Sequence, residues 1–150
     1  MGLDMYLYKK EYVQNWDHTP KEERHEVSVK RGGKKLNLGK VCYIESEVAY
    51  WRKANHIHGW FIRECANGID DCRPVYVSGR RIKELKKLIE TLLVSKDRDY
   101  AENILPPKEG FFFGSYVIDE YYWQDLENTL AMFNEMDVSN DDFFVYQASW

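Results

Sequence analysis

Apolar and polar positions alternate at the start of the chain. The apolar residues Leu3, Met5 and Leu7 are separated by polar or aromatic ones, and this period of two predicts a strand with one buried face. The stretch 143–149 and the short run 75–77 are further strand candidates. We expect the first and last strands to pair, which would hold both ends of the chain in the sheet.

Three stretches have helical spacing. The first runs from about 45 to 65, where Asn67 and Gly68 follow as a stop signal. Ser78 can cap the second helix, whose apolar positions are Ile82, Leu85, Leu88, Ile89 and Leu92. Asp119 opens the third helix. Its inward positions are Tyr122, Leu126, Leu130 and Phe133, and its outward positions are Glu120, Asp125 and Glu127.

The remaining segments are less regular. Residues 14–40 are polar, and within them a short strand over 26–30, with Val27 and Val29 inward, could end at Gly32–Gly33. Phe111–Phe113 is predicted to be a short buried strand. Together these elements predict one α+β domain over residues 1–150, with three helices packed on a mixed or antiparallel sheet of about four to five strands. We expect the segment 14–40 to be a polar insertion that could be mobile.

The composition supports a single domain, and the charges are distributed unevenly along the chain. A chain of 150 residues with 44% hydrophobic and 31% charged residues can bury a core of its own. Residues 1–40 carry nine basic and six acidic side chains, and residues 41–98 carry eleven basic and eight acidic ones. Residues 99–150 carry one basic and eleven acidic side chains. The acidic C-terminal part can simply be solvated, or it can present an acidic face to a basic partner.

The sequence predicts a cytoplasmic protein. No apolar run is long enough for a membrane span, and the N-terminus lacks the features of a signal peptide. The three cysteines, Cys42, Cys65 and Cys72, are too few and too unevenly placed for a disulfide framework, so we interpret them as reduced thiols.

The segment 50–61 holds the densest group of functional side chains. Its Arg and Lys can neutralise phosphate, its Trp residues can stack on a base, and its Asn can recognise a base edge. Aromatic and basic side chains are equally typical of a protein interface. Two loops could complete the site: Gly114–Ser115 can bind an anion, and Asp71 could bind a ribose hydroxyl or a cation, or only stabilise its own turn. The predicted ligand-binding residues are Trp51, Arg52, Lys53, Asn55, His58, Trp60, Asp71, Gly114 and Ser115.

Two histidines lie in this segment. His56 and His58 are about 200° apart on a helix, so they cannot chelate one metal ion together, and we expect no metal and no cofactor. His58 shares a stripe with Trp51 and Asn55, where it is either a core residue or a donor or base at the rim of a pocket. We expect His56 to lie on the exposed basic side, beside Arg52 and Arg63.

Several strings in the chain resemble a set of small proteins encoded by bacteriophages and prophages. They are MGLDMYLYKK, EVAYWRKANHIHGWF, NGIDDC, EGFFFGS, DEYYWQDLE and YQASW. The resemblance spans nearly the whole chain except the polar segment 14–40. It implies a setting, the bacterial cytoplasm during infection, but no particular activity and no catalytic residues.

Three functional hypotheses follow. The first is a binding protein that counteracts host defence by sequestering an anionic, nucleotide-like ligand. The second is an inhibitor that docks on a host protein and uses the acidic region 99–150 as a mimic of nucleic-acid charge. The third is a nucleotide-processing enzyme with His58 as base. We expect no membrane partner and no nucleic-acid partner, and homo-oligomerisation is left open because no heptad pattern demands it.

Overall fold

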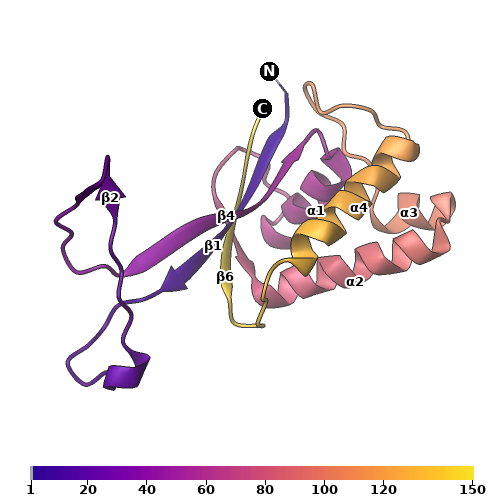
Figure 1. Cartoon of the computed structure of the whole chain (residues 1–150). Helices are drawn as coiled ribbons and strands as arrows, with labels where there is room; N and C mark the ends of the chain where they lie inside the picture. Colours follow the sequence, from indigo (N-terminus) through magenta and orange to yellow (C-terminus); the bar gives the residue numbers. More distant parts are fainter. Residues whose placement is uncertain (1) are drawn as a thin grey trace.

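A four-stranded antiparallel sheet is the frame of the structure, a computed structural model that describes residues 2–150. Its strands β1 (Asp4–Tyr12), β4 (Tyr43–Arg52), β5 (Val75–Ser78) and β6 (Phe143–Ser149) lie in the order β4-β1-β6-β5. The first and last strands pair as predicted, with Met5 opposite Ala148. The start of β1 and the end of β6 therefore lie side by side (Figure 1).

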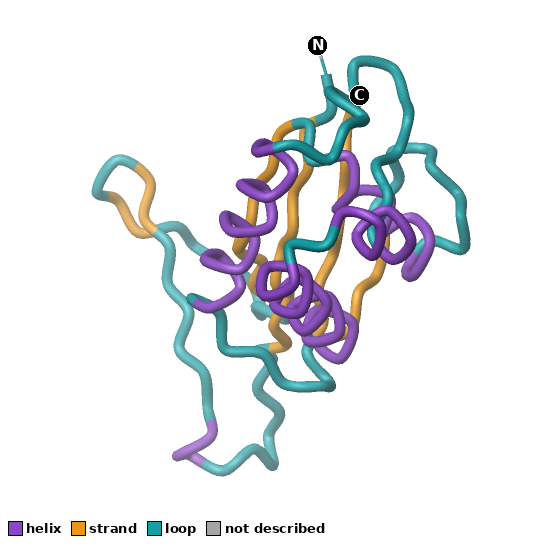
Figure 2. The backbone as a smooth tube through the Cα atoms, turned by 90° about the vertical axis from the view of Figure 1, so that its right-hand side faces the viewer, coloured by secondary structure: helices purple, strands orange, loops and turns teal. Residues whose placement is uncertain are grey.

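Four helices cover one face of the sheet (Figure 2). They are α1 (Asn55–Cys65), α2 (Gly79–Ser95), α3 (Arg98–Ile104) and α4 (Glu120–Asn134). The predicted caps are confirmed, because the Ser78 side chain accepts a hydrogen bond from Arg81 N, and Asp119 accepts from the backbone N–H groups of Tyr121 and Tyr122. The short helix α3, which Asp97 caps, was not predicted from the sequence.

The core lies between the helices and the covered face of the sheet. Met5 and Leu7 of β1, and Leu3 just before it, are fully buried there. The ring of Phe61 from α1 stacks on Tyr146 of β6 at 4.1 Å between centroids. No helix within residues 2–150 combines the length and the apolar character that a bilayer span requires.

The opposite face of the sheet carries no helix, and aromatic side chains stand on it. Tyr50, Tyr76 and Phe143 are 43%, 54% and 42% exposed there. Tyr6 packs against Tyr50 and Tyr8, and Tyr76 packs against Phe143. We call this surface the open face; its residues are Tyr6, Tyr8, Tyr50, Tyr76, Phe143 and Val145.

The predicted helix over 45–65 is wrong in its first half. Residues 43–52 form β4, and only 55–65 are helical. In β4, Ala49 and Trp51 are buried while Tyr50 and Arg52 are exposed, which is a period of two rather than 3.6. The turn between strand and helix depends on Lys53, which has a φ of 58° and donates its backbone N–H to Leu3 O at 2.8 Å.

Two short predicted strands are also wrong. Phe111–Phe113 is a loop in which Phe113 is buried and the other two rings are exposed. Positive φ values at Phe112 and Gly114 turn the backbone there. The predicted strand over 26–30 is reduced to β2 (Lys30–Arg31), which pairs with β3 (Lys34–Lys35), and Val29 is 44% exposed instead of facing inward. The turn at Gly32–Gly33 is confirmed.

Residues 13–42 leave the sheet as an arm between β1 and β4 (Figure 1). The arm contains a short 3₁₀ helix, η1 (Lys21–Glu23), and the β2–β3 hairpin. Its own hydrogen bonds hold it: Asn15 pairs with both backbone groups of His25, and Arg24 donates to the carbonyl oxygens of Trp16 and Thr19. Val13, where the arm leaves β1, is buried, but none of the residues 14–41 is.

Candidate functional site

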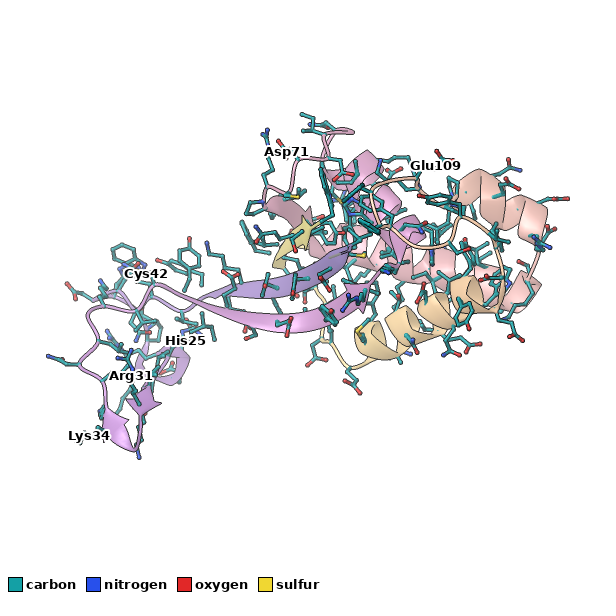
Figure 3. All side chains as sticks on the ribbon, turned by 90° about the horizontal axis from the view of Figure 1, so that it is seen from above. His25, Arg31, Lys34, Cys42, Asp71 and Glu109 are labelled. Carbon is teal, nitrogen blue, oxygen red and sulfur yellow. The ribbon has the colours of Figure 1, made fainter. Side chains whose placement is uncertain are left out.

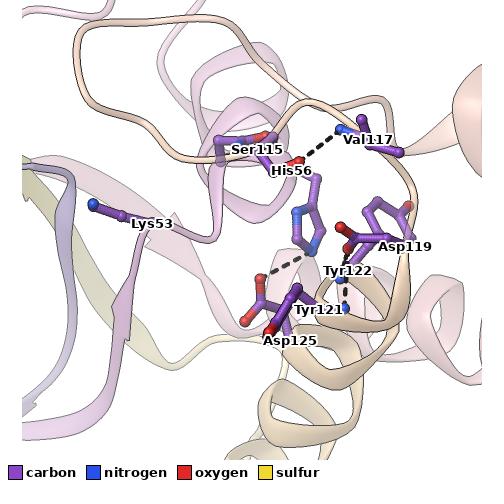
Figure 4. A pocket seen from close by; sticks show the side chains of 9 residues that line it. Lys53, His56, Ser115, Val117, Asp119, Tyr121, Tyr122 and Asp125 are labelled. Atoms are coloured by element: carbon purple, nitrogen blue, oxygen red, sulfur yellow. Dashed lines mark hydrogen bonds and ion pairs between the residues drawn. The ribbon is translucent and has the colours of Figure 1, made fainter.

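A small pocket opens where the N-terminal ends of α1 and α4 meet (Figure 4). It has a volume of about 50 Å³, enough for one or two water molecules and far below the several hundred cubic ångströms of a complete nucleotide site. It is lined by Lys53, Asn55, His56, Ser115, Val117, Asp119, Tyr121, Tyr122 and Asp125. Three of the predicted ligand-binding residues, Lys53, Asn55 and Ser115, therefore meet at one place.

His56 is the least satisfied polar group of this pocket. It is buried, not exposed as its place beside Arg52 and Arg63 predicted. Its Nε2 has no hydrogen-bond partner and points toward Asp125 Oδ2, 3.9 Å away (Figure 4). That distance is too long for a hydrogen bond. Its ring packs on Tyr122 at 4.2 Å between centroids.

Burial sets the charges of the pair. Desolvation lowers the pKa of His56 to about 3, so the imidazole is neutral at pH 7. Desolvation, together with the nearby Asp119 carboxylate, raises the pKa of Asp125 to about 6. At pH 7 Asp125 is thus mainly an anion beside a neutral ring, and the contact is not an ion pair.

Asn55 builds the wall of the pocket. Its amide donates to the carbonyl oxygens of Phe113 at 3.0 Å and Ser115 at 2.8 Å, and its side-chain oxygen accepts from Lys108 N at 3.0 Å. These bonds hold the loop 108–115 over the start of α1. The amide is thereby fully occupied, so it is not free to recognise a base edge.

His58 lies on the other side of α1, in a closed network. Its Nε2 is 3.0 Å from Asp70 Oδ2 and its Nδ1 is 2.6 Å from the Tyr146 hydroxyl. Because a carboxylate only accepts, Nε2 carries the proton and Tyr146 donates to Nδ1. Burial lowers the pKa of His58, against the opposite effect of Asp70. Trp150 Nε1 also donates to Asp70, at 3.2 Å.

This network is structural in its geometry. His58 is fully buried and both ring nitrogens are occupied. It connects α1 to the turn containing Asp70 and to β6. An enzyme hypothesis that uses His58 as base therefore lacks a route for substrate. The separation of the two histidines is confirmed, since His56 faces α4 and His58 faces β6. Among the described residues, no group of three or more His, Cys, Asp or Glu side chains is placed to hold a metal ion.

The other predicted site residues are dispersed. Trp51 is buried and its indole N–H donates to Thr129 Oγ1 at 2.8 Å, and Trp60 is 5% exposed. Arg52 is exposed at the end of β4. Asp71 pairs with its neighbour Arg73. Gly114, whose φ is 94°, passes close to the Lys53 side chain.

Asp125 is the residue that the sequence interpretation missed. It was expected to face outward on its helix, but its side chain is only 31% exposed and turns toward His56. A signal was present. Tyr122 and Thr129, three residues before it and four after it, are both buried, so helical spacing places Asp125 beside the core-facing stripe.

No protein-family model matches the chain, and neither a curated protein nor a solved structure is significantly similar to it. The geometry of the pocket and the surfaces of the fold are therefore the basis for a functional proposal.

Proposed function

We propose that the chain is a small binding protein that sequesters an anionic, nucleotide-like ligand. The observation that supports this best is the buried, unpartnered Nε2 of His56 beside the Asp125 carboxylate. A buried polar atom without a partner costs free energy. A ligand group that satisfies both side chains would recover that cost on binding.

The chemistry of the pair restricts the ligand group. Ionised Asp125 can only accept, so the ligand must present a donor to it, while His56 Nε2 can donate or accept according to its tautomer. A donor next to a second polar atom occurs on the edge of every nucleobase: an exocyclic amino group beside a ring nitrogen in adenine, cytosine and guanine, and the N3–H group beside a carbonyl oxygen in uracil. The pocket admits such an edge and nothing larger.

The remainder of the ligand would then lie outside the pocket. Tyr121 is 78% exposed at the rim and can cover a base. Figure 4 shows the Lys53 side chain pointing away from His56 and Asp125, where its ammonium group can neutralise a phosphate. Ser115, also at the rim, offers a hydroxyl.

Calorimetric titration of the full chain tests this proposal. The panel contains AMP, CMP, GMP and UMP together with cyclic and ADP-ribose-type nucleotides. We expect at least one of these nucleotides to bind. Asp125→Asn should weaken binding at least about tenfold, since a hydrogen bond to a charged partner is lost.

Glu127→Gln is the matched control, because it removes a carboxylate from the exposed side of the same helix. It should leave the affinity unchanged. Absence of binding across the panel would refute the proposal, and so would an Asp125→Asn variant that binds as tightly as the unmodified chain. In the phage setting that the sequence strings suggest, the ligand would be a nucleotide signal of host defence.

A second candidate is docking on a host protein, and the open face favours it. Uncovered aromatic side chains on a sheet are typical of protein contact surfaces. Tyr50→Asp with Tyr76→Asp should abolish capture of a partner, whereas Glu120→Gln with Glu127→Gln should not. If instead the acidic helix variant loses the partner and the complex weakens with salt, the acidic region acts as the mimic of nucleic-acid charge.

A further inference from the structure

The end of the arm is a hairpin made almost entirely of positive charge. Lys30, Arg31, Lys34 and Lys35 form its two strands and are all exposed; we call these four residues the basic tip. Gly32 and Gly33 form the turn with φ values of 56° and 81°, the pattern of a type I′ turn. A Cβ added at either glycine would meet no atom within 4 Å, so nothing obstructs the turn.

The register places like charges directly opposite each other. Lys30 pairs with Lys35, and Arg31 pairs with Lys34. Such cross-strand pairs repel and weaken a hairpin. No ion pair recorded for residues 2–150 includes any of the four. Residues 27–42 contain five basic and no acidic side chains, so the neighbouring sequence does not neutralise the tip either.

The fold separates this charge from the acidic part of the chain. Residues 1–42 carry nine basic and six acidic side chains, while residues 43–150 carry twelve and nineteen. Figure 3 shows Arg31 and Lys34 at the far end of the arm, on the opposite side of the molecule from Asp71 and Glu109. The net charge of −4 therefore conceals a positive tip held away from an acidic body.

We propose that the basic tip docks on the phosphodiester backbone of a nucleic-acid duplex, without sequence preference. Each of the two short strands carries two cationic side chains, and this dense positive charge matches the dense, regular negative charge of a duplex. A two-stranded ribbon fits a groove, and a turn without side chains allows the backbone to approach. Lys and Arg contacts to phosphate carry no sequence information. This proposal differs from the expectation of no nucleic-acid partner. That expectation rests on the negative net charge of the whole chain, whereas the arm holds its positive charges apart from the acidic residues.

Fluorescence anisotropy with a labelled 20-base-pair duplex of mixed sequence tests the proposal. The full chain is titrated at several NaCl concentrations between 25 and 200 mM. We expect binding that weakens with salt, with a log–log slope of about −2 to −4 for up to four phosphate contacts. The variant with Lys30, Arg31, Lys34 and Lys35 all changed to Gln should lose at least about tenfold in affinity at 50 mM NaCl and show a flatter slope.

The control changes Arg80, Lys83, Lys86 and Lys87 to Gln, which removes the same charges from α2. It should retain the affinity of the unmodified chain. Equal loss in both variants, or no salt-dependent binding by the unmodified chain, would overturn the proposal. Poly-L-glutamate that displaces the duplex as well as unlabelled duplex does would overturn it in favour of an acidic protein partner.

Discussion

At the scale of single residues, the most informative feature is that the fold places the buried His56 beside the half-buried Asp125 without a hydrogen bond between them. Their perturbed pKa values have the same main cause, desolvation, but opposite consequences for protonation. His56 resists gaining a proton in the folded state, and Asp125 resists losing one. The two residues therefore contribute opposite slopes to the pH dependence of stability.

Asp125→Asn should stabilise the protein above pH 6. The folded pKa of about 6 lies above the ordinary value of 3.8, so the ionised carboxylate disfavours the folded state. The pKa difference corresponds to at most about 3 kcal/mol; partial exposure screens some of it, and we expect about 1–2 kcal/mol. The gain should be complete near pH 8 and shrink as pH falls from 6 toward 4, because the folded carboxylate is then protonated, and it disappears only below the unfolded pKa of 3.8. Urea denaturation at pH 8 and pH 4.5 measures it.

The same variant exposes the effect of His56. Between about pH 6 and 4 the gain from protonating Asp125 offsets the loss from His56, whose unfolded form takes up a proton below pH 6.5. Without Asp125, stability should fall more steeply with acid than in the unmodified chain. Equal slopes in the two proteins would show that the buried pair does not titrate as its surroundings require.

Site residues were harder to predict than elements, because burial and partners depend on segments far apart in the sequence. Asn55 was expected in the site for its amide, yet that amide holds the loop 108–115. His58 was placed correctly on a stripe near the core, but its partners, Asp70 and Tyr146, come from a turn and from the last strand. Nothing local to either residue indicates those partners.

At the scale of elements, helices with caps and consistent spacing were predicted well, and segments of mixed character were not. The stripes of α2 and α4 and their caps Ser78 and Asp119 agree with the structure. The apolar residues within 43–52 fit the spacing of a helical stripe and also the alternation of a strand. This segment is a strand because it pairs with β1 in the sheet. A local sequence pattern does not contain that long-range contact.

Gly79→Ala tests how closely the start of α2 packs against the loop 139–142. Gly79 begins α2 and donates its N–H to Asp142 O at 2.9 Å. An added Cβ would lie 1.8 Å from Ser139 O, so the loop leading into β6 would have to move. We expect the free energy of unfolding to fall by about 2–4 kcal/mol, from overpacking and lost hydrogen bonds.

Gly39→Ala is the control for that measurement. No atom lies within 4 Å of its added Cβ, and its φ is not positive. Its stability in urea denaturation should be unchanged or slightly raised, because Ala restricts the unfolded chain. If both variants were equally stable, the loop 139–142 would be far more adaptable than its contacts with α2 indicate.

At the scale of the whole molecule, the α+β class could be predicted from the sequence, but the arrangement of the surfaces could not. The order of hydrophobic segments predicts a sheet with helices packed on it, and the sheet and its helices agree. It does not show that all helices lie on one face, which leaves Tyr50 and Tyr76 uncovered. Nor does a polar stretch between two strands reveal an arm with its own hydrogen bonds.

The arm should be removable without loss of the fold. Val13 N donates to Cys42 O at 2.9 Å, so an Asn-Gly turn in place of residues 14–41 would close β1 and β4 as a two-residue hairpin. No buried side chain is lost, and a shorter connection reduces the entropic cost of closing the loop between β1 and β4. We expect the free energy of unfolding to stay the same or rise by about 1–2 kcal/mol. A fall of more than about 2 kcal/mol would show that the arm supports the core.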